Sequence, residues 1–297
     1  MGDSELRTES FFDPGTSTFT HVIWDAASRR AAVIDPVLDY DPKSGRTRTA
    51  SADRVVTRVR ELELSVDWLL ETHLHADHLS AAPYLKERVG GQIVIGDQVT
   101  VVQRTFGTLF NAGDEFARDG RQFDRLVADG DRFEIGALRV SVLHTPGHTP
   151  ACVSYVVEAP GATPLQRVVF VGDTLFMPDY GTARCDFPGG NARELYRSIR
   201  KLLSLPPDTP LYLCHDYPPA GRAPQCMTTV AAQRASNIHV HDGVDEQAFI
   251  ELREKRDAKL EMPVLLLPAV QVNMRAGYLP PPEDNGIAYL KIPLNAV

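Results

Sequence analysis

The chain has 297 residues, a formal net charge of -8 and 43% hydrophobic residues, which fits a globular protein and argues against a disordered or fibrous one. The acidic balance and the absence of any Lys/Arg run disfavour a nucleic-acid partner, because phosphate binding depends on clustered cations. The most apolar stretch, Pro263–Pro268, is far shorter than the roughly 20 residues of a membrane-spanning helix. We therefore expect no membrane span.

The first ten residues and the cysteines bear on the compartment. Met1–Ser10 alternates polar and charged residues without an apolar centre, so we expect no secretory signal and a cytoplasmic location. The cysteines lack the paired spacing of a zinc finger, and in a chain of this size we expect free thiols. They are Cys152, Cys185, Cys214 and Cys226, and the sequence assigns them no role.

The first part of the chain alternates strand and helix patterns. Thr18–Trp24 and Ala31–Asp35 are predicted to be two strands of a hairpin. From Ser51, taken as an N-cap, apolar residues recur at helical spacing as far as Leu62. Val66–Glu71 is apolar and too short for a helix, so it is predicted to be a buried strand. It ends at a histidine-rich segment.

The rest of the chain continues this pattern. We predict helices over Ala81–Val89, Ala192–Leu203 and Val244–Leu260. We predict strands over Gln92–Ile95, Arg132–Leu143, Val153–Glu158, Arg167–Val171 and Pro210–Cys214. The stretch through Phe106 and Phe110 stays open, and Leu279–Pro282 is predicted to be an irregular tail. Hairpins followed by βα units indicate a mixed α/β structure with outer helices. We expect one domain over 1–297 with a C-terminal elaboration from about residue 226.

Three histidines and an aspartate gather within six residues directly after the strand Val66–Glu71. They are His73, His75, Asp77 and His78. A loop between a strand and a helix can aim several side chains at one point, and imidazole with a carboxylate suits zinc, iron or manganese. The alternative is a histidine-rich surface turn.

Three further candidates follow other predicted strands. His148 lies in the segment Pro146–Thr149, where Gly147 would let the backbone pass close to a site. Asp173 ends another apolar run, and a buried carboxylate needs a cation or hydrogen-bond donors. His215 ends the strand Pro210–Cys214. One such histidine alone is more often structural, but four strand ends carrying similar residues indicate a single rim.

These motifs, HxHxDH, PGHT, GDT and HDY, together resemble the metallo-β-lactamase superfamily, which includes glyoxalase II and persulfide dioxygenases. The resemblance covers most of the chain. It implies an αββα sandwich of two mixed β-sheets flanked by helices, with the site at one edge. In two-metal members, one ion would be bound by His73, His75 and His148, the other by Asp77, His78 and His215, and Asp173 would bridge them. All seven positions are filled.

A narrower resemblance is to the ETHE1-like persulfide dioxygenases, and it is closer than that to glyoxalase II. It is carried by Gly172–Leu175, Arg184–Phe187 and His215–Tyr217. It implies one Fe(II) per chain held by a facial triad with open positions for oxygen and substrate. The corresponding residues are His73, His148 and Asp173. The other four motif residues, His75, Asp77, His78 and His215, would then support the site or form an unfilled second one.

The substrate contacts are less sharply defined than the metal ligands. Met177–Ala183 is longer than in the mitochondrial-type enzyme, whereas Gln271–Gly277 resembles the bacterial branch. Arg184 would bind a glutathione carboxylate or merely pair with Asp186, and both stand as candidate catalytic residues. Tyr217 would donate a hydrogen bond toward the metal centre or simply pack.

Four polar residues outside the motifs have simpler interpretations. Asp35 either orients a ligand histidine or caps a turn. His21, His239 and His241 are expected to be exposed or to be polar groups of the core.

The sequence therefore favours an enzyme, a persulfide dioxygenase that oxidises glutathione persulfide with O2 at one Fe(II) to sulfite and glutathione. The alternative is a di-zinc thioester hydrolase of the glyoxalase II type, in which a metal-held hydroxide attacks a carbonyl. A third interpretation is a metal-containing sulfur-binding or regulatory protein without turnover. A homodimer is possible under each of them.

Overall fold

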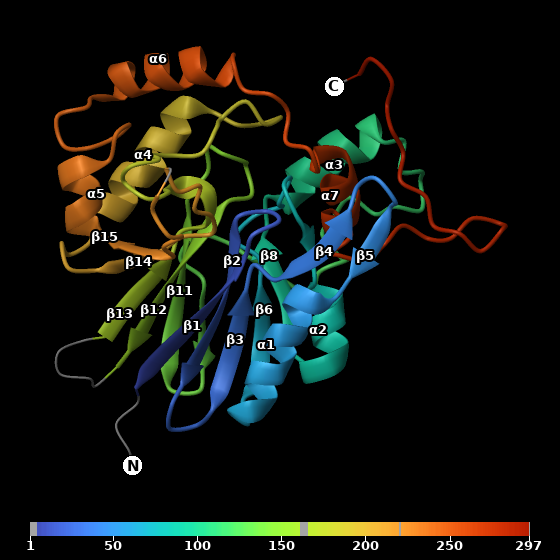
Figure 1. Cartoon of the computed structure of the whole chain (residues 1–297), viewed down its shortest axis with the longest axis horizontal. Helices are drawn as coiled ribbons and strands as arrows, with labels where there is room; N and C mark the ends of the chain where they lie inside the picture. Colours follow the sequence, from blue (N-terminus) through green and yellow to red (C-terminus); the bar gives the residue numbers. More distant parts are fainter. Residues whose placement is uncertain (1–4, 161–165, 220, 297) are drawn as a thin grey trace.

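The computed structural model describes residues 5–160, 166–219 and 221–296. Two six-stranded sheets form its centre, and helices cover their outer faces (Figure 1). Val22, Val33 and Leu69 of the first sheet pack against outer helices, whereas Ile23, Ile34 and Leu70 face residues of the second sheet. This alternation follows from the two-residue period of a strand. The predicted αββα sandwich of mixed sheets is confirmed.

The first sheet is antiparallel at one edge and parallel at the other. β1 pairs with β2 and β2 with β3 in antiparallel register, and β3, β6, β8 and β9 run parallel. The bounds are Leu6–Asp13 for β1, Thr18–Asp25 for β2, Arg30–Ile34 for β3, Ser65–Leu70 for β6, Gln92–Gly96 for β8 and Arg125–Val127 for β9. The parallel strands deliver their carboxyl ends to one edge of the sandwich.

The second sheet is antiparallel except where β13 and β14 pair in parallel. Its strands are β10 (Arg132–Ile135), β11 (Leu138–His144), β12 (Val153–Ala159), β13 (Gln166–Phe170), β14 (Pro210–Tyr212) and β15 (Met227–Thr229). A small sheet of β5 (Arg46–Arg48), β4 (Val37–Asp41) and β7 (Leu79–Ser80) lies beside them.

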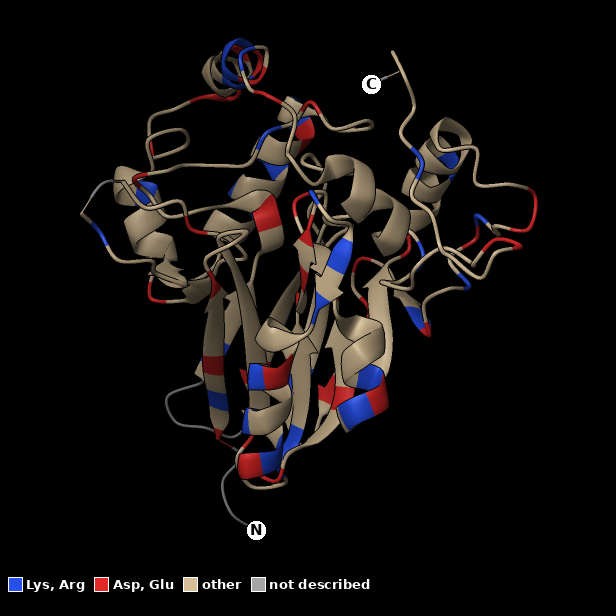
Figure 2. Cartoon of the chain, turned by 45° about the vertical axis from the view of Figure 1, so that its right-hand side comes forward, with Lys and Arg blue, Asp and Glu red and all other residues tan. Residues whose placement is uncertain are grey.

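The helices bury apolar faces against the two sheets. The first sheet is covered by α1 (Ala50–Glu61), α2 (Ala82–Val89) and α3 (Val99–Leu109), and the second by α4 (Ala192–Leu203) and α5 (Val230–Ser236), while α6 (Glu246–Asp257) packs on α4. The last helix, α7 (Leu266–Asn273), contacts β7. Charged residues of both signs are interspersed over the helices and loops (Figure 2). None of the helices in the described part of the chain is long and apolar enough to cross a membrane.

Several predicted elements need correction. The single strand predicted over Arg132–Leu143 is the hairpin β10–β11, because Gly136 adopts φ 59° and turns the chain. Ser51 is not the N-cap of α1. The helix begins at Ala50 with Thr49 as its N-cap, and the Ser51 hydroxyl donates to Asp39 (2.7 Å).

Other elements differ in extent or were not expected. The open stretch through Phe106 is α3. The helices α5 and α7 and the strands β1, β4, β5, β7, β9 and β15 were not predicted. The last predicted helix is shorter, because the Asp245 side chain caps it by accepting from Ala248 N (2.8 Å) and it ends at Asp257. That the whole chain forms one domain stays a prediction.

Candidate metal centre

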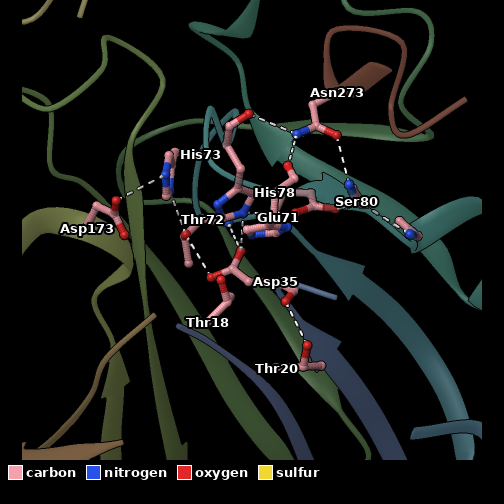
Figure 3. A network of polar contacts seen from close by, with 12 residues as sticks. Thr18, Thr20, Asp35, Glu71, Thr72, His73, His78, Ser80, Asp173 and Asn273 are labelled. Atoms are coloured by element: carbon pink, nitrogen blue, oxygen red, sulfur yellow. Dashed lines mark hydrogen bonds and ion pairs between the residues drawn. The ribbon is translucent and has the colours of Figure 1, made fainter. Parts of the chain in front are cut away.

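The seven motif residues meet at the edge where the strands of both sheets end. The loop after β6 carries His73, His75, Asp77 and His78; the loop after β11 carries His148; a 3-10 turn after β13 carries Asp173; and His215 follows β14. His73 and Asp173 point toward one another across the gap between the sheets (Figure 3). The predicted rim is therefore present.

His73, His148 and Asp173 form one compact group. Asp173 Oδ2 lies 3.7 Å from His73 Nε2 and 3.6 Å from His148 Nε2. These separations are too long for hydrogen bonds. They fit two ligands on a shared ion, because ligand atoms about 2.1 Å from a metal lie roughly 3–4 Å from one another. All three side chains are buried.

A second group lies beside the first. His215 Nε2 lies 3.0 Å from Asp77 Oδ2 and 3.4 Å from Asp173 Oδ1. Together with His75, Asp77 and His215 form a set of ligand atoms within 4.8 Å of one another. His78 falls instead into a set with His75 and Cys214, a thiol to which the sequence assigned no role.

Hydrogen bonds on the outer side of the site fix which nitrogen of three of its histidines faces inward. The Thr72 hydroxyl donates to Asp35 (2.9 Å), so it accepts from His73 Nδ1 (3.0 Å). His148 Nδ1 donates to Arg184 O (2.8 Å), and His78 Nδ1 donates to Leu79 O (3.1 Å). In each ring the other nitrogen, Nε2, keeps its lone pair and is free for a metal.

Among the residues that the structure describes, the inward atoms are buried and have no hydrogen-bond partner. They include His73 Nε2, His75 Nδ1, His78 Nε2, Asp173 Oδ1 and His215 Nε2. Buried polar atoms are nearly always paired, so such a convergence needs an explanation. Imidazole nitrogens and a carboxylate oxygen, left unpaired in neighbouring sets of ligand atoms, fit divalent transition metals. The arrangement is a metal-binding site.

The electrostatics favour the same conclusion. Burial, assisted by His75 and His148, lowers the pKa of His73 well below its usual value. Burial and His75 lower the pKa of His78 to about 3. Both rings are therefore neutral, as a metal ligand must be. Burial also raises the pKa of Asp173 against the opposing effect of His215 and His148, so a bound cation would stabilise its ionised form.

Asp35 holds the histidine loop through hydrogen bonds. Of its two interpretations, the structure therefore favours the one in which it orients a histidine of the site. It adopts φ 50° and accepts hydrogen bonds from Thr72 N (2.8 Å) and from His75 Nε2 (3.0 Å). Glu71, which the sequence did not single out, lies 3.2 Å from His75 Nε2. For His75, burial opposes protonation, but Asp35 and Glu71 outweigh it and raise its pKa well above the usual value.

Asn273 of α7 is a second supporting residue that sequence reasoning missed. Its amide nitrogen donates to the carbonyls of His75 and His78 (both 2.8 Å), and its amide oxygen accepts from Ser80 N (2.8 Å) (Figure 3). One buried side chain therefore holds two carbonyls of the ligand loop. The only sequence signal near Asn273 was the resemblance of Gln271–Gly277 to the bacterial branch.

A cavity of about 260 Å³ opens next to the metal-facing atoms of His148 and Asp173. Arg184 and Tyr217 line it. The Arg184 guanidinium pairs in bidentate fashion with Asp186 (2.5 and 2.6 Å) and also donates to Glu261 O (2.7 Å). The simpler of the two interpretations of Arg184 is therefore the one seen here. Tyr217 stacks on His215, with ring centroids 5.7 Å apart.

The remaining histidines and cysteines lie outside this group of atoms, Cys214 excepted. His21 is buried and hydrogen-bonds Ser10 (2.8 Å) and Leu213 O (3.0 Å), whereas His241 is exposed. His239 is buried and accepts from Thr182 N (3.0 Å). All four cysteines are free thiols, and only Cys226 is not buried.

Only glycine fits at position 147, directly before the ligand His148, because a larger residue would clash with α4. It has φ 132°, and a Cβ would lie 2.2 Å from the backbone nitrogen of Leu195 in α4. We expect Gly147→Ala to lower the free energy of unfolding by about 3 kcal/mol or more. Gly113→Ala is the matched control, since Gly113 also has positive φ (82°) but open space around it. It should cost about 1 kcal/mol, and equal losses in urea unfolding would contradict the steric argument.

Comparison with known proteins places this architecture. The model of the metallo-beta-lactamase superfamily matches residues 13–215. A probable metallo-hydrolase of Burkholderia pseudomallei is 64% identical, over 98% of this chain and 100% of that protein. Glyoxylase B2 of Dictyostelium discoideum is 49% identical, over 98% of each chain.

Relatives named ETHE1 have lower sequence identity to this chain. The mitochondrial persulfide dioxygenase ETHE1 of Bos taurus is 30% identical, over 92% of this chain and 89% of that protein. Among solved structures, ETHE1 from Myxococcus xanthus is similar with a TM-score of 0.70 and 32% identity, covering 92% of this chain and 100% of that one. With its two-sheet sandwich and its histidine and aspartate metal site, the chain belongs to the metallo-β-lactamase superfamily of enzymes.

Proposed function

We propose that the protein is a persulfide dioxygenase with one Fe(II) per chain, and that it acts on glutathione persulfide. Glutathione persulfide, dioxygen and water would give glutathione, sulfite and two protons. The terminal sulfur is oxidised, dioxygen is reduced, and the sulfur–sulfur bond breaks with its electron pair leaving on the glutathione sulfur. Both partners are small molecules that the cavity beside Asp173 would have to admit.

One observation carries the choice of a single metal. His73, His148 and Asp173 form a set of two imidazoles and one carboxylate, the donor set typical of non-haem iron oxygenases. Among the described residues, Asp77 and His215 group with His75 and not with His78. The ligand set expected for a second ion in dinuclear relatives is thus less compact than the triad.

The residues around the triad would bind and orient the substrate. Phe176, Leu260 and Pro263 line the cavity with apolar surface, which would exclude water from a reactive sulfur. Burial, with Asp77 and Asp173 nearby, raises the pKa of Tyr217 well above its usual value, so its phenol stays a hydrogen-bond donor at neutral pH. Fe(II), when bound, would supply the redox chemistry that joins sulfur to oxygen.

The relatives support this proposal without deciding it. A chain 30% identical over most of both lengths is named a persulfide dioxygenase, and the ETHE1 structure has 32% identity. Arg184 and Asp186 carry the narrower resemblance; Arg184 lines the cavity and is ion-paired with Asp186, which does not line it. A substrate carboxylate could approach Arg184 only by sharing its guanidinium with Asp186.

A di-zinc thioester hydrolase is the second candidate. It is favoured by the additional set of His75, Asp77 and His215 and by 49% identity to a protein named Glyoxylase B2. In that case the ions would hold a hydroxide nucleophile. A sulfur-binding protein without turnover would retain the site and show neither reaction.

Oxygen uptake separates these candidates. We expect purified, iron-loaded protein to consume dioxygen when glutathione persulfide is added and to release sulfite in equal amount. S-lactoylglutathione should be hydrolysed slowly or not at all. Rapid thioester hydrolysis without oxygen uptake would overturn the proposal in favour of the hydrolase, and neither reaction would leave the binding protein. Zinc-loaded protein is the control for oxygen uptake, because Zn²⁺ has no redox chemistry.

A further inference from the structure

The orientation of His148 depends on a single backbone atom. Its Nδ1 donates to the carbonyl oxygen of Arg184 (2.8 Å), which leaves Nε2 to face Asp173. A ligand histidine held in this way keeps one tautomer and one ring orientation. The position of the Arg184 carbonyl therefore decides where the lone pair of His148 points.

No strand or helix holds that carbonyl in place. The described residues from Leu175 to Asn191 form turns and irregular backbone only, so the carbonyl depends on contacts from outside the segment. Two such contacts come from α6 and bracket Arg184 in the chain. Arg253 Nη1 donates to Thr182 O (3.1 Å), and Asp257 Oδ2 accepts from Cys185 N (2.8 Å).

Arg253 and Asp257 are themselves an ion pair one helical turn apart, and their side chains are 1% and 6% exposed. Two charges so deeply buried are costly, and a buried pair is often no more stabilising than apolar residues of similar size. Each of the two side chains also forms a hydrogen bond with the backbone of the segment that carries Arg184. α6 packs on α4 at the outer face of the second sheet (Figure 1), and it lies beyond the residues 13–215 that match the family.

We propose that Arg253 and Asp257 are positioning residues for the metal ligand His148. Their hydrogen bonds to the backbone of Thr182 and Cys185 hold the Arg184 carbonyl in position. That carbonyl in turn orients the His148 imidazole so that Nε2 faces the metal. This inference rests on His148 being a ligand in the proposed function. It does not depend on whether the metal is iron or zinc.

Metal affinity is the direct test, with Zn²⁺ as the probe in competition with a chromophoric chelator. We expect Asp257→Asn and Arg253→Lys to weaken Zn²⁺ binding roughly 10- to 100-fold, the range for partners that orient a ligand. Glu254→Gln is the matched control, because Glu254 is exposed on the same helix and no ion pair of its side chain is found in the described chain. It should bind Zn²⁺ as the unaltered protein does.

A double-mutant cycle distinguishes positioning from general loss of folding. In a His148→Ala background, Asp257→Asn should weaken Zn²⁺ binding no further, because the residue through which it acts is already gone. Additive losses, or unchanged affinity in both single variants with native circular dichroism, would overturn the inference. If His148→Ala itself bound Zn²⁺ at full strength, the ligand assignment in the proposed function would fail instead.

Discussion

Asp173→Ala is expected to abolish both iron binding and turnover. Asp173 supplies the only carboxylate of the triad, and its Oδ2 lies between His73 and His148 at 3.7 and 3.6 Å. Loss of a ligand should cost more than the roughly 10- to 100-fold typical of the residues that support one. His73→Ala and His148→Ala should behave in the same way. Iron content and oxygen uptake, measured on proteins prepared identically, check this.

The melting temperature of the metal-free Asp173→Ala protein distinguishes ligand loss from unfolding as the cause. Burial raises the pKa of Asp173, and its Oδ1 has no hydrogen-bond partner within the described part of the chain. Removing such a group should leave the melting temperature of the metal-free protein unchanged or raise it. An Asp173→Ala protein that folds and keeps full iron and activity would remove this residue from the site.

Unlike Asp173→Ala, His215→Ala is expected to keep near-normal iron content and to lower the rate of turnover. In the mononuclear account His215 helps to order the cavity, since its Nε2 lies 3.4 Å from Asp173 Oδ1 and its ring stacks on Tyr217. Asp77→Asn and His78→Ala should follow it. We expect the rate to fall on the order of 10- to 100-fold in each, as measured by oxygen uptake.

Metal content in the same three variants separates one ion from two. If a second ion is required, each substitution removes a ligand and the content should fall in parallel across His215, Asp77 and His78. His241→Ala is the control, because His241 is exposed and lies outside the site. Parallel metal loss in the three variants, with the control unchanged, would contradict the mononuclear assignment.

The sequence predicted the rim of the site because strand ends are local signals. Val66–Glu71 and the apolar run before Asp173 are short and followed by polar ligands, and the strands β6 and β13 do end there. Asp35 followed the same logic at the end of β3.

What the sequence missed depends on contacts between distant segments. Asn273 reaches His75 across 198 positions, and the Arg184 carbonyl reaches His148 across 36. Periodicity within a window cannot reveal such pairs. The strand predicted over Arg132–Leu143 was wrong for a different reason. Gly136 marked its turn, but the apolar pattern on both sides continued through it.

The most direct test of the central claim is the metal content of the unaltered chain after expression with sufficient iron and zinc. We predict about one iron per chain and negligible zinc, because the triad of His73, His148 and Asp173 needs one ion. Elemental analysis showing two tightly held zinc ions per chain and no iron would contradict the account.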